Sequence, residues 1–267
     1  MITGDNKDTA INIAKEIGLI SNEKDLVLTN TDLKKLSDSE IKAILPRIKV
    51  IARSMPQDKS RLVRIAKEEK LVVGMTGDGV NDAPALKKAD VGFAMGNGTE
   101  VAKEASDIVI LDDNFLSIAN AILYGRTIFK SIRKFIIFQL TINLCAVSLS
   151  IIGPFIGIET PVTVIQMLWI NMIMDTLAGI AFSYEPPLKS YMEESPKPKD
   201  EKIMNSYMYS EIIFTGFYSS LLCLFFLKSP WIESIYRTAD TNKYLMTAFF
   251  ALFIFMGIFN CFNARTP

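Results

Sequence analysis

Four long apolar stretches in the second half of the chain constrain its fold more than any other feature. They lie at about 135–155, 162–182, 207–227 and 244–262. Each is close to the roughly 20 residues that a helix needs to cross the hydrocarbon core of a bilayer, which is about 30 Å thick. The chain as a whole, with 49% hydrophobic residues, is also more apolar than most soluble proteins. We therefore predict a multi-pass integral membrane protein whose residues 135–267 form an all-α bundle of four transmembrane helices.

Most lysine and arginine residues near these stretches lie on one side, and Lys228, Arg237 and Lys243, after the third stretch, are the exceptions. Four of them precede the first stretch: Arg126, Lys130, Arg133 and Lys134. Four more follow the second stretch: Lys189, Lys197, Lys199 and Lys202. The turn at 156–161 contains none. Because positively charged loops tend to stay in the cytoplasm, we predict that residues 1–134 are cytoplasmic and that 126–134 form a basic stalk leading into the first transmembrane helix.

Residues 1–125 have a different character, alternating short β-type runs with helical patterns. The runs at 50–53, 71–77, 91–95 and 107–111 are rich in Val and Ile and are bounded by turn residues. Apolar residues recur at helical spacing within 6–19 and 55–70. This alternation predicts an α/β domain with a parallel sheet and helices on both sides, whose ligands bind beyond the carboxyl ends of the strands.

The segment VVGMTGDGVNDAPAL carries the strongest chemical signal of this first half. A hydrophobic strand leads directly into Asp78, Asn81 and Asp82 around a glycine turn. Two carboxylates four residues apart suit Mg²⁺, which prefers a few carboxylate oxygens together with water and phosphate oxygens. Asn81 and free backbone N–H groups are suited to hold a phosphoryl group. The alternative is a polar loop that only turns the chain.

Two shorter segments supply further donors for phosphate. MITGD places Thr3, Gly4 and Asp5 in a turn before a helix, and MPQDK places Lys59 in the first turn of another. Hydroxyl, amide and ammonium groups all donate hydrogen bonds to phosphate oxygens. Taken singly, such residues are also common as helix caps and solvated charges.

The second apolar stretch contains a carboxylate, in LWINMIMDTLAG. A charged residue at mid-span costs about 2.5–3.5 kcal/mol on insertion scales, so it is normally paired or functional. Asn171 and Asp175 are four residues apart and so are predicted to share one helix face. Asn143, in the preceding stretch, is a third oxygen donor. We predict a site for a transported hard cation, and the alternative for Asn143 or Gln139 is hydrogen bonding between helices.

Composition excludes several classes of function. Lys and Arg total 29 and Asp and Glu total 29, so net charge does not favour a nucleic-acid partner. The sequence contains no histidine, which excludes a Ser-His-Asp or Cys-His mechanism for this chain alone. The three cysteines, at 145, 223 and 261, lie in separate apolar stretches and are interpreted as small core residues.

Over some forty residues, TGDGVNDAPALKKADVGFAMGNGTEVAKEASDIVILDDNF resembles the hinge motif of P-type cation-transporting ATPases. MITGD, MPQDK and QMLWINMIMDTLAG…EPP also fall in that family's order. The resemblance implies a haloacid-dehalogenase-like, Rossmann-type phosphorylation domain that uses ATP and Mg²⁺ in an aspartyl-phosphate cycle. It assigns Mg²⁺ to Asp78, support of the same loop to Asp82, and the nucleotide side to Asp5. It also places four residues against the phosphoryl group: Thr3, Gly4, Lys59 and Asn81.

The family's other motifs do not occur in this sequence. There is no DKTGT string with the acceptor aspartate, no TGE actuator motif and no nucleotide-domain lysine motif. The resemblance therefore implies that an N-terminal part of the pump is missing and that this chain is not competent alone.

The membrane residues bear on the transported ion. Ala146 stands where two-site calcium pumps carry Glu, and Met174 stands where they carry Thr. Both departures resemble the plasma-membrane type, which moves one Ca²⁺ per ATP. A pump for Na⁺, Mn²⁺ or H⁺, a membrane-anchored Mg²⁺-dependent phosphatase and a non-catalytic remnant remain as alternatives.

Overall fold

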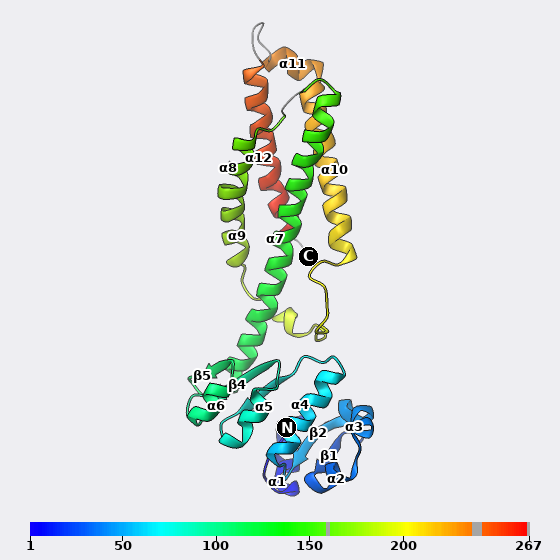
Figure 1. Cartoon of the computed structure of the whole chain (residues 1–267), viewed down its shortest axis with the longest axis vertical. Helices are drawn as coiled ribbons and strands as arrows, with labels where there is room; N and C mark the ends of the chain where they lie inside the picture. Colours follow the sequence, from blue (N-terminus) through cyan, green and yellow to red (C-terminus); the bar gives the residue numbers. More distant parts are fainter. Residues whose placement is uncertain (159–160, 237–241, 266–267) are drawn as a thin grey trace. The chain divides into compact units, whose positions relative to one another are not determined.

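The computed structural model describes residues 1–158, 161–236 and 242–265, and the chain divides into two compact units (Figure 1). Met1–Ile122 together with Glu194–Glu201 form the first, which we call the α/β unit. Leu123–Glu193 and the residues from Lys202 onward form the second, which we call the helical unit.

All strand pairings in the α/β unit are parallel, but its strands form two small sheets. In the first sheet, β1 (Leu26–Thr29) pairs with β2 (Ile48–Ala52), and Ile2 forms a bridge to Ile51 on the other side of β2. In the second, β4 (Val91–Met95) lies between β3 (Gly74–Gly77) and β5 (Ile108–Ile110). The predicted parallel α/β fold is thus confirmed, while the single sheet expected from the sequence is divided in two.

The predicted strands match β2, β3, β4 and β5 to within three residues at either end. Strand β1, with only the four residues LVLT, was not predicted from the sequence. Two short helices that follow β1 were not predicted either. These are α2 (Asn30–Lys35) and α3 (Asp38–Ile44), and each starts with a capping box, at Thr29 and at Ser37. Such a box satisfies two of the free N–H groups at a helix start.

Helix α4 (Pro56–Glu68) packs against both sheets and so holds the α/β unit together. Its Leu62 and Ile65 join the core next to the first sheet, with Ile51 of β2. Its Val63 joins the core next to the second sheet, with Met75 of β3. Leu62 and Ile65 therefore lie on one face of α4, and Val63 lies on the neighbouring face. Because these two faces contact different sheets, α4 fixes the carboxyl ends of β2 and β3 relative to each other.

The remaining helices of the α/β unit are short. They are α1 (Lys7–Glu16), η1 (Leu45–Arg47), η2 (Val80–Asp82), α5 (Ala83–Leu86) and α6 (Glu100–Ala105). Thr99 caps α6 by accepting a hydrogen bond from the N–H of Ala102.

Asp90 fastens the segment Glu194–Glu201 to the α/β unit. Its carboxylate accepts hydrogen bonds from Lys199 Nζ at 2.7 Å and from the N–H of Val73 at 3.0 Å, and Lys67 Nζ lies 3.3 Å away. Burial acts to raise the pKa of this carboxyl, but the bonds from Lys199, Val73 and Lys67 outweigh burial and lower the pKa below its usual value. The carboxylate is therefore held in its charged form at neutral pH.

Among the described residues, four helices are long and apolar enough to cross a membrane, at Phe115–Phe155, Val164–Ser183, Ser206–Lys228 and Lys243–Arg265, and the helical unit contains all of them except the first residues of the first. The first is α7, a single helix that includes both the predicted stalk and the first predicted span. The second is broken into α8 (Val164–Trp169), a π-helical turn η3 (Ile170–Met174) and α9 (Asp175–Ser183). The third and fourth are α10 and α12. Their presence confirms the predicted four-helix membrane bundle.

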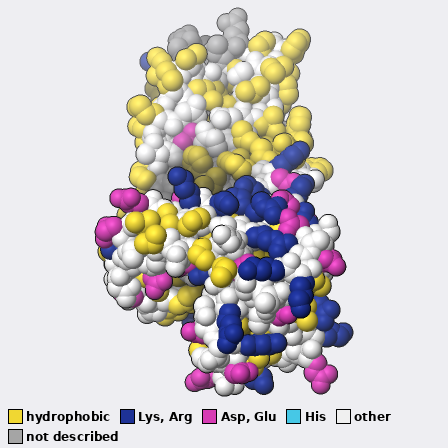
Figure 2. Space-filling view, turned by 60° about the horizontal axis from the view of Figure 1, so that its bottom comes forward, with side chains coloured by type: hydrophobic (Ala, Val, Ile, Leu, Met, Phe, Trp, Pro, Cys, Tyr) yellow, Lys and Arg dark blue, Asp and Glu magenta, His cyan; other side chains and the backbone are white. Residues whose placement is uncertain are grey.

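These helices lie side by side around one apolar core (Figure 1). Phe138, Leu149, Ile170, Cys223 and Phe249 are among its most buried members. Two short helices connect the long ones: η4 (Lys189–Met192) and α11 (Pro230–Tyr236). On the face of the bundle visible in Figure 2, hydrophobic side chains predominate, which suits contact with lipid chains.

Candidate functional site

In the α/β unit, the loop after β3 places two carboxylates in different surroundings. Asp78 is exposed at the end of the strand, whereas Asp82 is 6% exposed. The backbone N–H of Asp78 donates to Asp82 Oδ2 at 3.4 Å, and its carbonyl accepts from the N–H of Thr99 at 2.8 Å. The loop is therefore fixed through its backbone, and the carboxylate of Asp78 is available to solvent.

Gly77 allows Asp82 to approach the strand end. A Cβ atom at position 77 would lie 2.4 Å from Cβ of Asp82 and 2.8 Å from its Oδ2. Real Cβ atoms do not tolerate such distances, so this position requires glycine in the observed loop.

We expect Gly77→Ala to displace Asp82 and to destabilise the α/β unit by about 1–3 kcal/mol, the usual cost of forcing an atom into a packed site. Hydrogen exchange of the β3 and α5 amides in the full chain measures this loss. Gly4→Ala is the matched control because nothing lies within 4 Å of a Cβ built at position 4. Equal effects of the two substitutions would contradict the role given to Gly77.

Lys59 of α4 forms an ion pair with Asp82. The Nζ–Oδ1 distance is 2.5 Å, and the two side chains are 18% and 8% exposed. The start of α4 is itself anchored by Asp58, which accepts hydrogen bonds from the N–H of Met55 and from Asn30 Nδ2. The structure thus brings together Lys59 and the loop after β3, two features that lie 23 residues apart in the sequence.

The turn at Thr3 is built by local hydrogen bonds. Thr3 Oγ1 donates to Asp5 Oδ2 at 2.8 Å and accepts from the N–H of Asp5 at 3.2 Å. Ser54, which precedes α4, donates to the carbonyl of Thr3 through both its N–H and its hydroxyl. Because Ser54 lies just before α4, and α4 carries Lys59, these bonds place the Thr3 turn at the same edge of the α/β unit as Lys59. Gly4 and Asn81 are both exposed.

This edge of the α/β unit combines an exposed carboxylate, a partly buried ammonium group and a hydroxyl-bearing turn. Such groups match the needs of a phosphate ester with a hard divalent cation, because the cation takes carboxylate oxygens and the ammonium group and N–H donors take phosphate oxygens.

In the helical unit, Asp175 is buried inside the bundle at 7% exposure. Gln139 of α7 donates from Nε2 to Asp175 Oδ2 at 2.5 Å. Among the described residues, Asp175 Oδ1 and Gln139 Oε1 have no hydrogen-bond partner, although both are buried. Each of these two hydrogen-bonded side chains, one on α7 and one on α9, therefore has a buried oxygen atom with unused lone pairs. A buried carboxylate with one hydrogen bond is unfavourable unless something compensates its charge.

The other two predicted ion ligands are less enclosed. Asn143 of α7 is half-buried, one helical turn beyond Gln139, and Asn171 is exposed in the described chain. The helix around Asn171 is a π-turn in which the N–H of Asp175 donates to the carbonyl of Ile170, five residues earlier. The regular i,i+4 geometry assumed from the sequence therefore does not apply between Asn171 and Asp175. π-turns are frequent at functional sites.

Gln139 and Asn260, each with a buried side-chain atom that has no partner among the described residues, were not among the predicted ligands. Gln139 lies four residues before Asn143, so the rule that such residues share a helix face contained the signal for it. Asn260 of α12 is 9% exposed, and its Nδ2 has no partner among the described residues. No pattern in the sequence around Asn260 distinguishes it from the polar residues at the end of that helix.

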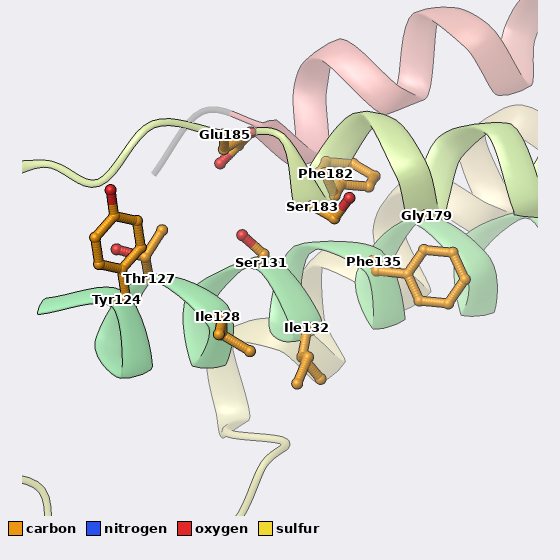
Figure 3. Close-up of a pocket in the computed structure, with 10 residues that line it drawn as sticks. All are labelled: Tyr124, Thr127, Ile128, Ser131, Ile132, Phe135, Gly179, Phe182, Ser183 and Glu185. Carbon is orange, nitrogen blue, oxygen red and sulfur yellow. The ribbon is translucent and has the colours of Figure 1, made fainter. Parts of the chain in front are cut away.

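A cavity of about 280 Å³ opens between α7 and the end of α9 (Figure 3). Its lining is mostly apolar, with Phe135, Gly179 and Phe182 at one end and Tyr124 and Glu185 at the other. Asp175 and Gln139 do not line it, so this cavity is separate from the buried carboxylate.

Glu185, just after α9, links the end of α9 to the middle of α7 and to the end of α12 beside this cavity. Its carboxylate forms ion pairs with Lys134 of α7 (Nζ–Oε2, 2.8 Å) and with Arg265 of α12 (Nε–Oε1, 3.2 Å). The side chain of Glu185 is 10% exposed. It follows α9 in the EPP motif noted in the sequence.

Comparison with known proteins decides the family. The model for the C-terminus of cation-transporting ATPases matches residues 159–267, and two models for haloacid dehalogenase-like hydrolases match 1–90 and 61–122. A probable calcium-transporting ATPase 6 of plasma-membrane type from Oryza sativa subsp. japonica is 41% identical over 99% of this chain. The chain belongs to the cation-transporting P-type ATPases.

Other curated relatives give the same picture for this ATPase chain. Calcium-transporting ATPase 8 and putative calcium-transporting ATPase 13 from Arabidopsis thaliana, both of plasma-membrane type, are 39% and 42% identical over its whole length. In all three cases the chain spans 26% of the relative's length. The α/β unit thus has a haloacid-dehalogenase-like fold, and the ATPase chain is an integral membrane protein.

Proposed function

We propose that this chain forms part of an ATP-driven pump that moves Ca²⁺ across the plasma membrane through an aspartyl-phosphate cycle. The observation that carries the proposal is the buried carboxylate of Asp175, which has one partner, Gln139, and one oxygen without any among the described residues. The similarity of the chain to plasma-membrane-type calcium-transporting ATPases supports Ca²⁺ as the transported ion.

Within the membrane, Asp175 is proposed to bind the transported ion, with Asn143 and Asn171 as further oxygen donors. A hard cation neutralises the carboxylate and uses its unpaired oxygen, so it removes the energetic cost of burying that charge. Gln139 holds the carboxylate by one oxygen and leaves the other for the ion. The π-turn supports the proposal because it leaves the helix backbone irregular next to the carboxylate.

In the α/β unit, the residues after β3 fit a magnesium ion bound together with a phosphoryl group. The exposed carboxylate of Asp78 would hold Mg²⁺, and the ion would neutralise phosphate charge. Asp82, engaged by Lys59, supports the loop. Lys59 also has remaining N–H groups that would donate to a phosphoryl oxygen, together with Thr3, Gly4 and Asn81. Asp5 is proposed to lie on the nucleotide side, where ATP binds.

This site needs a nucleophile that the chain does not carry, because no DKTGT aspartate occurs in its sequence. Among the residues that the structure describes, strand β3 has a neighbouring strand on one side of it only. We propose that a further part of the pump supplies the acceptor aspartate, the nucleotide domain and the actuator, and that residues 1–134 lie in the cytoplasm. The continuous helix α7, which includes the basic stalk 126–134, is proposed to transmit changes at the phosphorylation site to Asn143 and Gln139.

Transport by a complete pump tests this function. The chain is joined to the upstream three quarters of Arabidopsis calcium-transporting ATPase 8, and ATP-dependent uptake of radioactive calcium is measured in membrane vesicles. We expect uptake that requires Mg²⁺ and ATP. Uptake of Na⁺ or Mn²⁺ in place of Ca²⁺ would show that the transported ion is not Ca²⁺. A correctly inserted pump that transports no cation would favour a phosphatase or a non-catalytic remnant.

A further inference from the structure

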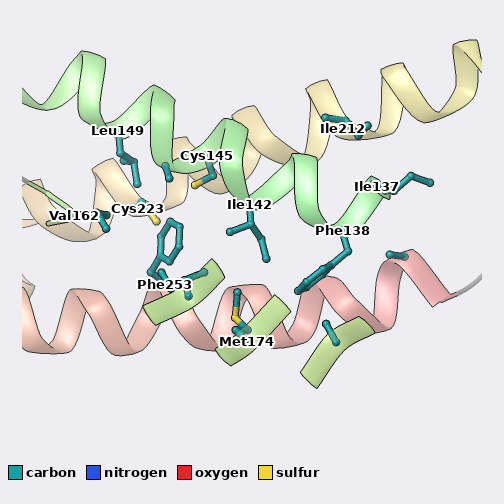
Figure 4. Packing of buried hydrophobic residues seen from close by; sticks show 14 of the residues in the cluster. Ile137, Phe138, Ile142, Cys145, Leu149, Val162, Met174, Ile212, Cys223 and Phe253 are labelled. Atoms are coloured by element: carbon teal, nitrogen blue, oxygen red, sulfur yellow. The ribbon is translucent and has the colours of Figure 1, made fainter. Parts of the chain in front are cut away.

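A small cavity of about 10 Å³ lies in the core of the helical unit, between α7, α10 and α12. Most of its lining is apolar, and Figure 4 shows Ile142 and Cys145 of α7 and Phe253 of α12 pointing into the core between these helices. Among the described residues, three lining side chains carry oxygen or nitrogen, one from each helix: Thr141 of α7, Ser219 of α10 and Asn260 of α12. The cavity therefore gathers polar groups from three helices that otherwise pack through apolar side chains.

The side chain of Asn260 lacks an acceptor for its amide N–H groups. Asn260 is 9% exposed, and its Nδ2 has no hydrogen-bond partner in the part of the chain that the structure describes. Buried polar groups in proteins are nearly always bonded to another residue or to ordered water, because an unpaired buried donor is costly. Since Asn260 lines the cavity, we expect an acceptor to be present there.

Thr141 has the opposite requirement. It is 2% exposed, and its hydroxyl donates its one proton to the carbonyl of Ile137 at 2.7 Å. A hydroxyl that has used its proton still accepts hydrogen bonds through its lone pairs. One cavity thus contains a donor without an acceptor, on α12, and an oxygen that accepts but cannot donate, on α7. The two groups are not bonded to each other directly, because Asn260 Nδ2 has no partner among the described residues.

A water molecule matches both groups. It accepts a hydrogen bond from Asn260 and donates one to Thr141, and its second proton is available to the hydroxyl of Ser219. A buried water needs two to four polar partners and a cavity of at least about 10–15 Å³. The observed volume of about 10 Å³ meets the lower limit and holds one molecule. A metal ion fits poorly, because an N–H donor repels a cation and the described lining contains no carboxylate.

We propose that this cavity binds one water molecule, which bridges α7, α10 and α12. The water accepts from Asn260 Nδ2 and donates to Thr141 Oγ1 and to Ser219 Oγ. Because Thr141 lies between Gln139 and Asn143 in the sequence, the water ties this segment of α7 to two helices that carry no predicted ion ligand. The site does not depend on the transport proposal, since none of its polar residues was predicted to bind the transported ion.

Transfer of magnetisation from water to the side-chain amide of Asn260 tests the proposal. The complete chain of 267 residues is labelled with ¹⁵N in asparagine and phenylalanine and studied by solid-state NMR in lipid bilayers. The Asn260 resonance is assigned by its loss in Asn260→Leu. We expect transfer to Asn260 to be roughly fivefold faster than transfer to the backbone amide of Phe249, because a bound water lies within hydrogen-bond distance of Asn260. Phe249 lies in the same core and is 0% exposed.

Substitutions of the other two polar residues make this result specific. Thr141→Val keeps the shape of the side chain and removes the accepting oxygen, and Ser219→Ala removes the third partner. Each is expected to slow the transfer to Asn260 about threefold, because a buried water with fewer partners is held less firmly. Ser220→Ala is the matched control: Ser220 is adjacent on α10, its hydroxyl donates to the carbonyl of Gly216, and it does not line the cavity. It should leave the transfer unchanged.

Three results would overturn the proposal. Transfer to Asn260 that is no faster than transfer to Phe249 would show that the cavity is dry, and this comparison within the parent chain holds even where a variant fails to fold. Unchanged transfer in both Thr141→Val and Ser219→Ala, with folding established by circular dichroism, would show that the amide is hydrated from elsewhere. An equal loss in Ser220→Ala would show that the effect is not specific to the cavity. Asp175→Asn should leave the transfer unchanged, so failure of the transport proposal is distinguishable from failure of this one.

Discussion

Replacing Asp175 with Asn in the complete pump is expected to reduce ATP-dependent Ca²⁺ uptake by at least 100-fold. The substitution preserves the size of the side chain, and it removes the negative charge that the proposed ion neutralises. A neutral amide cannot compensate a dehydrated divalent cation as a carboxylate does. Uptake of radioactive calcium by vesicles, normalised to the amount of inserted pump, measures the effect.

Neighbouring substitutions make this result specific. Thr176 is next to Asp175 but exposed, and its hydroxyl donates to the carbonyl of Met172. Thr176→Val should therefore retain most of the uptake. Gln139→Leu removes the one hydrogen bond to the carboxylate and should raise the Ca²⁺ concentration needed for half-maximal uptake. Normal uptake by Asp175→Asn would remove Asp175 from the ion pathway.

Lys59→Met is expected to destabilise the α/β unit by about 2–4 kcal/mol. Asp82 is buried, and without Lys59 the long bond from the N–H of Asp78 is the one hydrogen bond to its carboxylate among the described residues. Breaking a buried ion pair from one side is costly because the remaining charge is left without compensation, and the partial exposure of Lys59 reduces that cost. Hydrogen exchange of the β3 and α5 amides in the full chain should accelerate roughly 30-fold or more.

Lys70→Met is the matched control for this prediction. Lys70 pairs with Asp200 at 3.0 Å, but the two side chains are 73% and 64% exposed. Exposed ion pairs contribute about 0–1 kcal/mol, so this substitution should change exchange little. If both lysine substitutions had the same effect, the ion pair of Lys59 would not be structurally important.

The strongest patterns in the sequence were sufficient for the fold class. The apolar stretches are long enough to identify four membrane helices without any knowledge of their contacts. The Val- and Ile-rich runs gave β2 to β5, because buried parallel strands are continuously apolar. The four residues of β1 were missed although β5, which was predicted, is shorter, so the length of an apolar run alone does not identify such strands. The division into two sheets could not be predicted, because strand pairing depends on contacts between distant segments.

The candidate site was only partly accessible from the sequence. The motif after β3 identified Asp78 and Asp82, but their different exposure arises from the tertiary contact between Asp82 and Lys59. Asp175 was found because a carboxylate in an apolar stretch needs a reason. The π-turn before it was not found, because helical periodicity assumes a regular hydrogen-bond pattern. That Gln139 is the hydrogen-bond partner of Asp175 could not be predicted, because it depends on how α7 packs against α9.

The most direct test of the central claim measures the phosphorylated enzyme in the complete pump, with and without Asp175→Asn. We predict that the parent forms a phosphoenzyme from ATP only when micromolar Ca²⁺ is present, and that Asp175→Asn forms none from ATP at any Ca²⁺ concentration. Phosphorylation of the same variant by inorganic phosphate in the presence of Mg²⁺ should persist, because the α/β unit is intact. Phosphorylation of Asp175→Asn from ATP with an unchanged Ca²⁺ requirement would contradict the assignment of the buried carboxylate to the transported ion.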